Sequence, residues 1–300
     1  MSVAIKEEPV RFSGHDTFHC REQWLLKGLQ LVQDENGVGV FRKNEAIPIL
    51  GVGKNMVRSI NHWIKAFGLL NAENELNELA KDLFIKDGFD RYLEKEGSLW
   101  LLQFSICQTK YASLFTYIFS EYFSDKATLE FSESQLYNFV ERHLKATGHK
   151  PVTPKTFSAD FKVLVRTYVS PVKNEKTVED DFNAPLLSLN LISDTGRKNE
   201  KGEPVYRLNK SAQDIPVEIF AHCMLSEFPT QSLLSFDDIR KSVGSFLCLS
   251  NDALEKKIEE MCGAYKEFVY KEDAGLRQLQ VRITNEDFKK TLLKEYYENK

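Results

Sequence analysis

The stretch from Gly51 to Leu70, GVGKNMVRSINHWIKAFGLL, decides the fold of the N-terminal part of the chain. A glycine-rich turn at 51–53 precedes a predicted helix over about residues 54–67, which Gly68 ends. At about 100° per residue, one arc of this helix is apolar. The opposite arc is polar and basic, with Lys54, Asn55, Arg58, His62 and Lys65. With a short helix before the turn, this pattern predicts a helix-turn-helix whose second helix suits the major groove of DNA, although an ordinary solvated helix face has the same pattern.

The composition is that of a folded chain that can bury hydrophobic cores. Hydrophobic residues make up 42% and charged residues 28% of the 300 residues, which suggests two or three domains at about 150 residues each. The net charge of −4 argues against a protein that coats nucleic acid, but it leaves room for local basic patches. We expect a cytoplasmic protein that does not enter a membrane. The five cysteines are scattered, and the sequence has neither a signal-peptide pattern nor a long apolar run.

A second basic helix is predicted about a hundred residues after the first. Thr153-Pro154 supplies an N-cap residue and a proline at the first helical position. One arc of the helix is apolar, and the other carries Lys155, Lys162 and Arg166. A β-hairpin is predicted over 180–208, with Leu186, Leu187 and Leu189 in its first strand, and its tip over 193–203 carries Arg197, Lys198 and Lys201. A basic tip behind a basic helix suits a wing that lies along phosphates, while a solvated loop is the alternative.

We therefore predict a mainly α fold with small β-hairpins, in which tandem winged-helix or helix-turn-helix units surround a helical scaffold. The predicted units are an N-terminal motif with a winged helix (1–90), a central helical scaffold (91–128), a second, basic winged helix (129–212) and an acidic winged-helix-like unit (213–300). A helix of the last unit exposes Asp252, Glu255, Glu259 and Glu260. Phosphate would be repelled by this face, so we assign the unit to packing or to a protein partner.

The sequence FSGHDTF at Phe12–Phe18 is the motif that best fits a role beyond packing. Its polar members can form hydrogen bonds, and a glycine allows close backbone approach to a phosphate. The residues of unknown role are Ser13, Gly14, His15, Asp16 and Thr17, with Arg21 shortly after them. The alternative is a helix cap, in which Asp16 or Thr17 caps the next helix while Phe12 and Phe18 pack against Trp24.

Several strings together resemble a bacterial family known as domain of unknown function 4007. They are FSGHDTF at 12–18, LGVGKNMVRSI at 50–60 and LVRTY at 164–168, and the resemblance covers roughly residues 12–290. Asp16 replaces the expected Glu, and His19-Cys20 replaces Pro-Leu, so no role for His19 is inherited. The resemblance implies no reaction. It implies an accessory protein of an anti-phage island, often beside an enzyme of the phosphoadenosine-phosphosulfate-reductase type, a setting that resembles DNA phosphorothioation systems.

Catalytic and metal sites fit the residues less well. His15, Asp16, His19 and Cys20 are possible metal ligands by type, but they are crowded into six residues with no second pair elsewhere. Lys54 follows a glycine as in a phosphate-binding loop, yet Asn55 occupies the position of the required Ser or Thr. No nucleophile-elbow motif occurs. We therefore expect a protein without catalysis, metal or cofactor.

The sequence thus favours a DNA-binding protein, of a kind that could sense modified DNA, in a bacterial phage-defence or DNA-modification system. Its expected partners are double-stranded DNA and a phosphoadenosine-phosphosulfate-reductase-like enzyme or another defence-island protein. The alternative is a protein-interaction adaptor of a defence complex that does not itself bind DNA, and the overall acidic charge favours that alternative.

Overall fold

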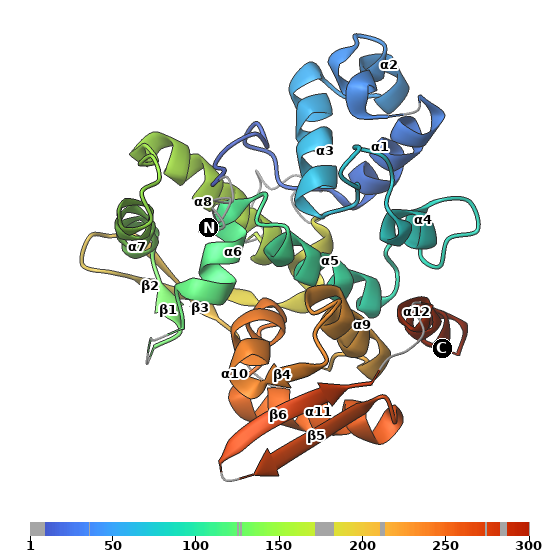
Figure 1. Cartoon of the computed structure of the whole chain (residues 1–300). Coiled ribbons are helices and arrows are strands. Elements are labelled where there is room, and N and C mark those ends of the chain that lie inside the picture. Colours follow the sequence, from blue (N-terminus) through green and yellow to red (C-terminus); the bar gives the residue numbers. More distant parts are fainter. Residues whose placement is uncertain are drawn as a thin grey trace, which may run out of the picture.

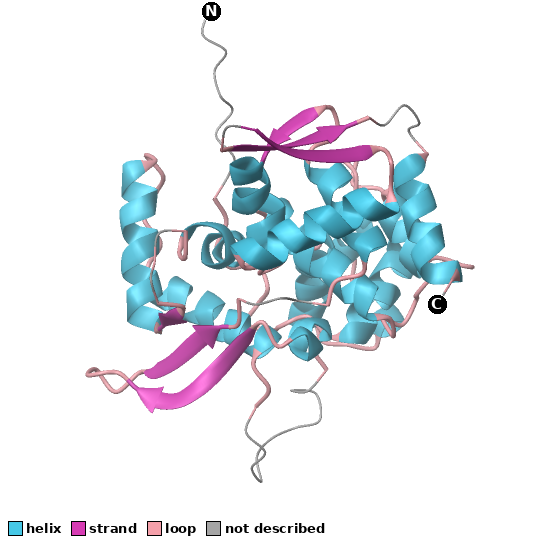
Figure 2. Ribbon diagram, turned by 90° about the horizontal axis from the view of Figure 1, so that it is seen from below, coloured by secondary structure: helices cyan, strands magenta, loops and turns pink. Residues whose placement is uncertain are grey.

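The computed structural model describes residues 10–35, 37–124, 126, 128–171, 183–210, 214–273, 275–282 and 287–299. Helices fill the centre, and two small antiparallel sheets lie toward the outside (Figures 1 and 2). The buried apolar side chains form one cluster that runs from Cys20 to Tyr297. This is the mainly α architecture with small hairpins that the sequence predicts. None of the described helices is long and apolar enough to cross a membrane.

The N-terminal region is built on two helices that pack closely together. Its elements are α1 (Glu22–Asp34), a 3-10 helix (Val38–Arg42), α2 (Ala46–Leu50), α3 (Lys54–Ala66) and α4 (Glu78–Phe84). Gly28 lets α1 approach α3, because a Cβ there would lie 2.6 Å from side-chain atoms of Ile60 and Ile64. Gly68, at φ +60°, follows the end of α3. The predicted wing after α3 is reduced to one antiparallel bridge between Leu70 and Leu76.

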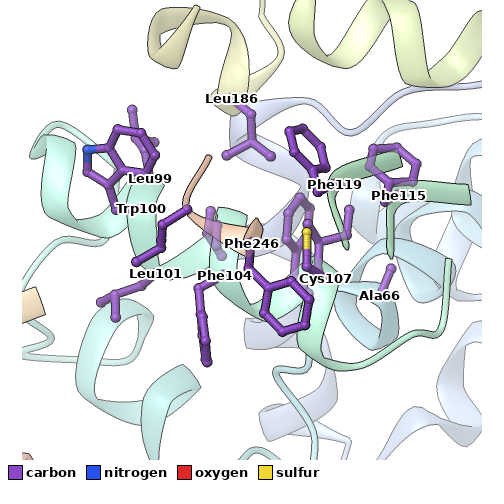
Figure 3. Close-up of a cluster of buried hydrophobic side chains, with 14 of the residues drawn as sticks. Ala66, Leu99, Trp100, Leu101, Phe104, Cys107, Phe115, Phe119, Leu186 and Phe246 are labelled. Carbon is purple, nitrogen blue, oxygen red and sulfur yellow. The ribbon is translucent and has the colours of Figure 1, made fainter. Parts of the chain in front are cut away.

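The centre of the molecule holds α5 (Glu96–Gln108), α6 (Ser113–Thr116) and the π-helix that continues α6 (Tyr117–Glu121). Every residue of α5 from Gly97 to Cys107 is buried. Figure 3 shows side chains of this region, including Phe104 and Cys107, among Phe115, Leu186 and Phe246. Helices α5 and α6 pack against each other here, and the aromatic side chains of this region belong to the hydrophobic core.

The next region contains the second basic helix and a three-stranded sheet in the order β1-β3-β2. Its elements are β1 (Glu130–Phe131), α7 (Glu133–Ala146), α8 (Pro154–Tyr168), a 3-10 helix (Pro185–Leu189), β2 (Ile192–Lys198) and β3 (Pro204–Leu208). Thr153 caps α8 by accepting a hydrogen bond from the Thr156 amide at 3.2 Å.

The prediction that Leu186, Leu187 and Leu189 lie in a hairpin strand is wrong, because they form the 3-10 helix. Pro185 starts that helix with a fixed φ and no amide donor, and all three leucines are buried. The 3-10 helix packs on α5 and α8, and Leu186 and Leu189 belong to the hydrophobic core rather than to the sheet. Residues 180–182, also part of the predicted hairpin, lie outside the described residues.

The C-terminal region combines helices with a second sheet in the order β4-β6-β5. Its elements are α9 (Val217–Glu227), β4 (Leu233–Ser235), α10 (Phe236–Ile239), a π-helix (Arg240–Gly244), α11 (Asn251–Ala264), β5 (Phe268–Asp273), β6 (Leu276–Val281) and α12 (Phe288–Glu298). Helix α9 packs on both α11 and α12. Tyr296 of α12 accepts a hydrogen bond from the Gly97 amide at 2.9 Å, which joins the C-terminal helix to the central α5.

Candidate nucleic-acid interface

Helix α3 exposes most of its predicted basic face. Lys54, Asn55 and Arg58 are exposed, and Lys65 is half-buried. His62 is the exception, with only 4% of its surface accessible, so its placement on an exposed face is wrong. The FSGHDTF segment covers it: a Cβ built on Gly14 would lie 2.8 Å from Nδ1 of His62. The helical period places His62 beside Arg58, but the period contains no information about a segment that folds over the helix.

The His62 ring lies in an aromatic cluster. Its centroid is 5.6 Å from that of His15, 5.2 Å from that of Trp63 and 5.3 Å from that of Tyr111. Burial first, and then the charges of the nearby His15 and Arg11, lower the pKa of His62 to about 3. The ring is therefore neutral near neutral pH. Its Nε2 atom is buried and has no hydrogen-bond partner among the described residues.

The FSGHDTF segment is a compact turn with an unusual backbone. Ser13, Gly14, Asp16 and Thr17 all have positive φ, at 67°, 98°, 46° and 66°. Such conformations cost energy in residues other than glycine and persist where tertiary contacts hold them. In Figure 1 this dark-blue start of the described chain passes between α8 and α3. Its long-range side-chain hydrogen bonds are made with these two helices.

The helix-cap interpretation of this segment is wrong. The N-cap residue of α1 is Arg21, and no side chain caps the helix there. Phe18 does pack against Trp24, with ring centroids 6.2 Å apart, and the Arg21 guanidinium lies 5.2 Å from the Trp24 ring centroid. Phe12 instead contacts Tyr117, at 6.4 Å. The polar residues of the motif are thus used for long-range contacts and not for local capping.

His15 and Asp160 form a buried hydrogen-bonded pair between the motif and α8. His15 Nε2 lies 2.9 Å from Asp160 Oδ1, and the two residues are 4% and 6% exposed. The Thr17 amide donates to His15 Nδ1 at 3.1 Å, so Nε2 carries the proton and donates to the carboxylate. The Ser13 amide also donates to both carboxylate oxygens, at 3.0 and 2.9 Å.

The sequence did not identify Asp160 as a site residue, although one signal was present. Asp160 is the only acidic residue between Arg142 and Lys173, in the most basic part of the chain.

A second contact joins the motif to α3. The Nε of Arg58 donates to Oδ2 of Asp16 at 2.8 Å, and its Nη2 donates to Oδ1 of Asn55 at 2.8 Å. Asp16 therefore orients a predicted DNA-contacting arginine at the surface, while its neighbour His15 is bound to α8. The motif is a bridge between the two basic helices.

Replacement of Gly14 by alanine tests how tightly this bridge is packed. Gly14→Ala is expected to destabilise the fold by about 1–3 kcal/mol, because alanine is strained at φ +98° and its Cβ would press on the His62 ring. Gly196→Ala is the matched control, since Gly196 has φ +69° but nothing within 4 Å of a built Cβ. Urea unfolding of both variants measures the difference. Equal losses would show that the contact with His62 contributes nothing.

Helix α8 exposes its predicted cations, Lys155, Lys162 and Arg166. Within the described part of the chain, no ion pair is formed by any of the three. At about 100° per residue, they lie roughly 200–240° around the helix from Asp160, which faces the motif. The basic faces of α3 and α8 therefore do not merge across the motif, and α8 presents its cations on its far side.

The hairpin tip is smaller than the sequence predicts. Arg197 lies within β2, where its guanidinium pairs with Glu130 at 2.5 Å, so its placement in a free tip is wrong. Glu130 of β1 also binds Arg207 of β3 at 2.7 Å, and cross-strand charge pairing of this kind draws Arg197 into the sheet. Lys198 and Lys201 remain exposed at the end of the hairpin, beside a turn closed by the bond from the Asn199 amide to the Glu203 carbonyl.

The residues weighed as metal ligands are engaged elsewhere. His15 binds Asp160, Asp16 binds Arg58, and burial raises the pKa of the Cys20 thiol well above its usual value. No group of three or more His, Cys, Asp or Glu side chains that could hold a metal is found among the described residues.

Comparisons with known proteins identify a family and a fold. The model of the family described as "Protein of unknown function (DUF4007)" matches residues 12–297. No curated protein sequence matches significantly. Two solved structures, titled "SspB crystal structure" and "Magnesium ion-bound SspB crystal structure", share the fold with a TM-score of 0.81 each. Their sequence identities are 23% and 22%, and each comparison covers 97% of this chain and 89% of the other.

Proposed function

Because the chain belongs to the DUF4007 family, whose description assigns no activity, we propose its function from its surface: it binds double-stranded DNA without catalysing a reaction. The observation that carries this proposal is the exposed face of α8. Lys155, Lys162 and Arg166 lie within twelve residues on one helix face and make no ion pair in the described structure. Exposed cations that no carboxylate neutralises are the groups that bind phosphates.

The order of the elements supports winged-helix-like units as the scaffold for this binding. In the second region, α7 and α8 are followed by the β2–β3 hairpin, and in the third, α11 is followed by β5 and β6. We infer that the basic face of α8 and the end of the hairpin, with Lys198 and Lys201, bind phosphates of the same duplex. Lys54 and Arg58 of α3 supply a second, separate contact. We also propose that the protein acts in the cytoplasm, within a bacterial phage-defence or DNA-modification system.

The overall negative charge is compatible with this proposal because acidic groups gather in the C-terminal region, where several are also paired. Glu255 of α11 accepts from Tyr270 at 2.9 Å and from Arg277 at 3.0 Å, and Glu260 pairs with Lys257 at 2.6 Å. These carboxylates lie in the C-terminal region, away in sequence from α3 and α8. DNA would bind to the exposed face of α8, and the C-terminal region would be available to other partners.

A salt titration of duplex binding tests the proposal. Lys162→Ala is expected to lower the affinity about three- to tenfold at moderate salt and to reduce the slope of log K against log salt by about 0.9. Arg58→Ala is expected to have an effect of similar size, additive with that of Lys162→Ala because the two faces are separate. Lys256→Ala, which removes an exposed cation from α11, is the matched control and should change nothing. Unmodified and phosphorothioate-containing duplexes, each with and without Mg²⁺, are compared in the same assay.

Unchanged binding in both Arg58→Ala and Lys162→Ala would overturn the DNA proposal. The remaining candidate would then be an adaptor that docks a protein of the same defence system. Two large apolar side chains of the C-terminal sheet favour such a contact, since Leu233 is 57% exposed and Leu276 is 67% exposed. Co-purification of a partner enzyme, such as one of the phosphoadenosine-phosphosulfate-reductase type, together with no affinity for DNA at low salt, would select this function.

A further inference from the structure

A cavity of about 360 Å³ opens beside α3, and the described residues that line it include five cations and no carboxylate. It lies between the first described residues, the segment 41–47, the exposed start of α3 and Tyr111. The basic residues that line it are Arg11, Arg42, Lys43, Lys54 and Arg58. Its size is at the lower end of the range for pockets that bind small organic molecules.

Three of these cations are not neutralised by any described carboxylate. Lys43 pairs with Glu35 at 3.4 Å and Arg58 with Asp16 at 2.8 Å. Arg11, Arg42 and Lys54 make no ion pair with the acidic groups that the structure describes, and Arg11 lies over the Tyr111 ring at 4.2 Å. The positive charges also act on Lys65, because its pKa is lowered by burial and then by the charges of Arg11 and Arg42. The cavity is therefore suited to an anion.

Asn61 and His62 line the cavity, and their unpaired polar atoms indicate more than a bare anion. The Nε2 of His62 and the Oδ1 of Asn61 are buried and have no hydrogen-bond partner among the described residues. Both atoms are covered in the structure, so a ligand in the cavity reaches them when the side chains turn toward it. A buried polar atom without a partner destabilises the fold, so a ligand that bonds to both atoms would remove that destabilisation. An amide oxygen accepts only, so the ligand must also carry a hydrogen-bond donor. Inorganic phosphate dianion has few donors, whereas a nucleotide has hydroxyl or amino groups next to its phosphate.

We propose that this cavity binds one nucleotide, with its phosphoryl group on Arg42, Lys54 and Arg11 and its donor groups on Asn61 and His62. The nucleotide can be free or part of a DNA strand, since the chemistry that recognises it is the same. The proposal does not depend on duplex binding by α8, because a free mononucleotide can occupy the cavity in either case.

Isothermal titration calorimetry of the full chain tests the proposal with four probes at low salt. They are deoxyadenosine 5′-monophosphate, deoxyadenosine, inorganic phosphate and a 5′-phosphorylated single-stranded oligonucleotide. The monophosphate is expected to bind at least tenfold more tightly than either deoxyadenosine or phosphate. Arg42→Ala combined with Lys54→Ala should weaken it tenfold or more, because hydrogen bonds to charged groups are lost. Both residues are exposed, so the variant should fold, and Lys27→Ala on α1 is the matched control.

The probes separate the two sources of the ligand and the two proposals. Binding of the oligonucleotide alone, lost in the Arg42/Lys54 variant, would support the proposal with a strand as the source. Binding of the monophosphate, lost in the same variant, would support it with a free nucleotide as the source. Phosphate that binds as tightly as the monophosphate, no binding of any probe, or binding unchanged in the variant would overturn it. Lys162→Ala should leave monophosphate binding unchanged, so failure of the DNA proposal is visible separately.

Discussion

Asp160→Ala is expected to destabilise the protein by about 2–6 kcal/mol, because it leaves two donors without partners at about 1–3 kcal/mol each. The substitution removes both acceptor oxygens and leaves the Ser13 amide and the His15 Nε2–H without partners. The motif is strained in its backbone and held by these contacts, so it is expected to detach from α8. Urea unfolding measures the loss of stability, and faster hydrogen exchange of the Ser13 amide reports the detachment.

A variant on the same helix makes this prediction specific. Lys162→Ala, two residues away on the exposed face of α8, should change stability by no more than about 0.5 kcal/mol. His15→Ala added to Asp160→Ala should cost little more than Asp160→Ala alone, because the shared hydrogen bond is already broken. If the losses from His15→Ala and Asp160→Ala add fully, the pair does not act as one unit and the proposed bridge is wrong.

The parts of the fold that the sequence predicts well are those with several local signals that agree. For α3, the helical period, the turn at 51–53 and Gly68 place both ends to within about one residue of the observed Lys54–Ala66. For α8, Thr153 and Pro154 mark the start directly. The leucines of 186–189 have no such agreement, since a short apolar run fits a strand and a buried helical turn equally well. Pro185 is the local signal against the strand, because proline has a fixed φ and no amide donor.

The candidate site is less predictable because long-range contacts build it. His15 and Asp160 are 145 positions apart, and Asp16 and Arg58 are 42 positions apart. No periodicity within one helix relates such residues. The exposed cations of α8 were nevertheless predicted correctly, because their exposure follows from an apolar arc on the same helix. The basic cavity was not predicted, since the residues on its wall come from separate segments of the chain.

Two buried histidines are expected to make the protein sensitive to mild acid. His62 and His222 are each 4% exposed, and burial, together with nearby positive charges, lowers the pKa of each to about 3. For His222, the charge of Lys289 adds to this lowering, and a hydrogen bond to the Lys289 carbonyl opposes it. In the unfolded chain both groups titrate near pH 6.5. Between pH 6.5 and 3, the unfolded state therefore binds more protons than the folded state, and stability falls as the pH falls.

The expected loss between pH 7.5 and pH 5.0 is about 2 kcal/mol for each histidine, or about 4 kcal/mol for the two together. Urea unfolding of the full chain at these two pH values measures it. His62→Gln combined with His222→Gln is expected to lower stability at pH 7.5 but to remove most of the difference between the two pH values, because glutamine does not titrate. A pH difference of the same size in the double variant would mean that other groups cause the acid sensitivity. A double variant without the difference would identify the two histidines as its source. Nucleotide bound in the cavity beside His62 should then reduce the part of the loss that comes from that residue, since an anion stabilises the protonated ring.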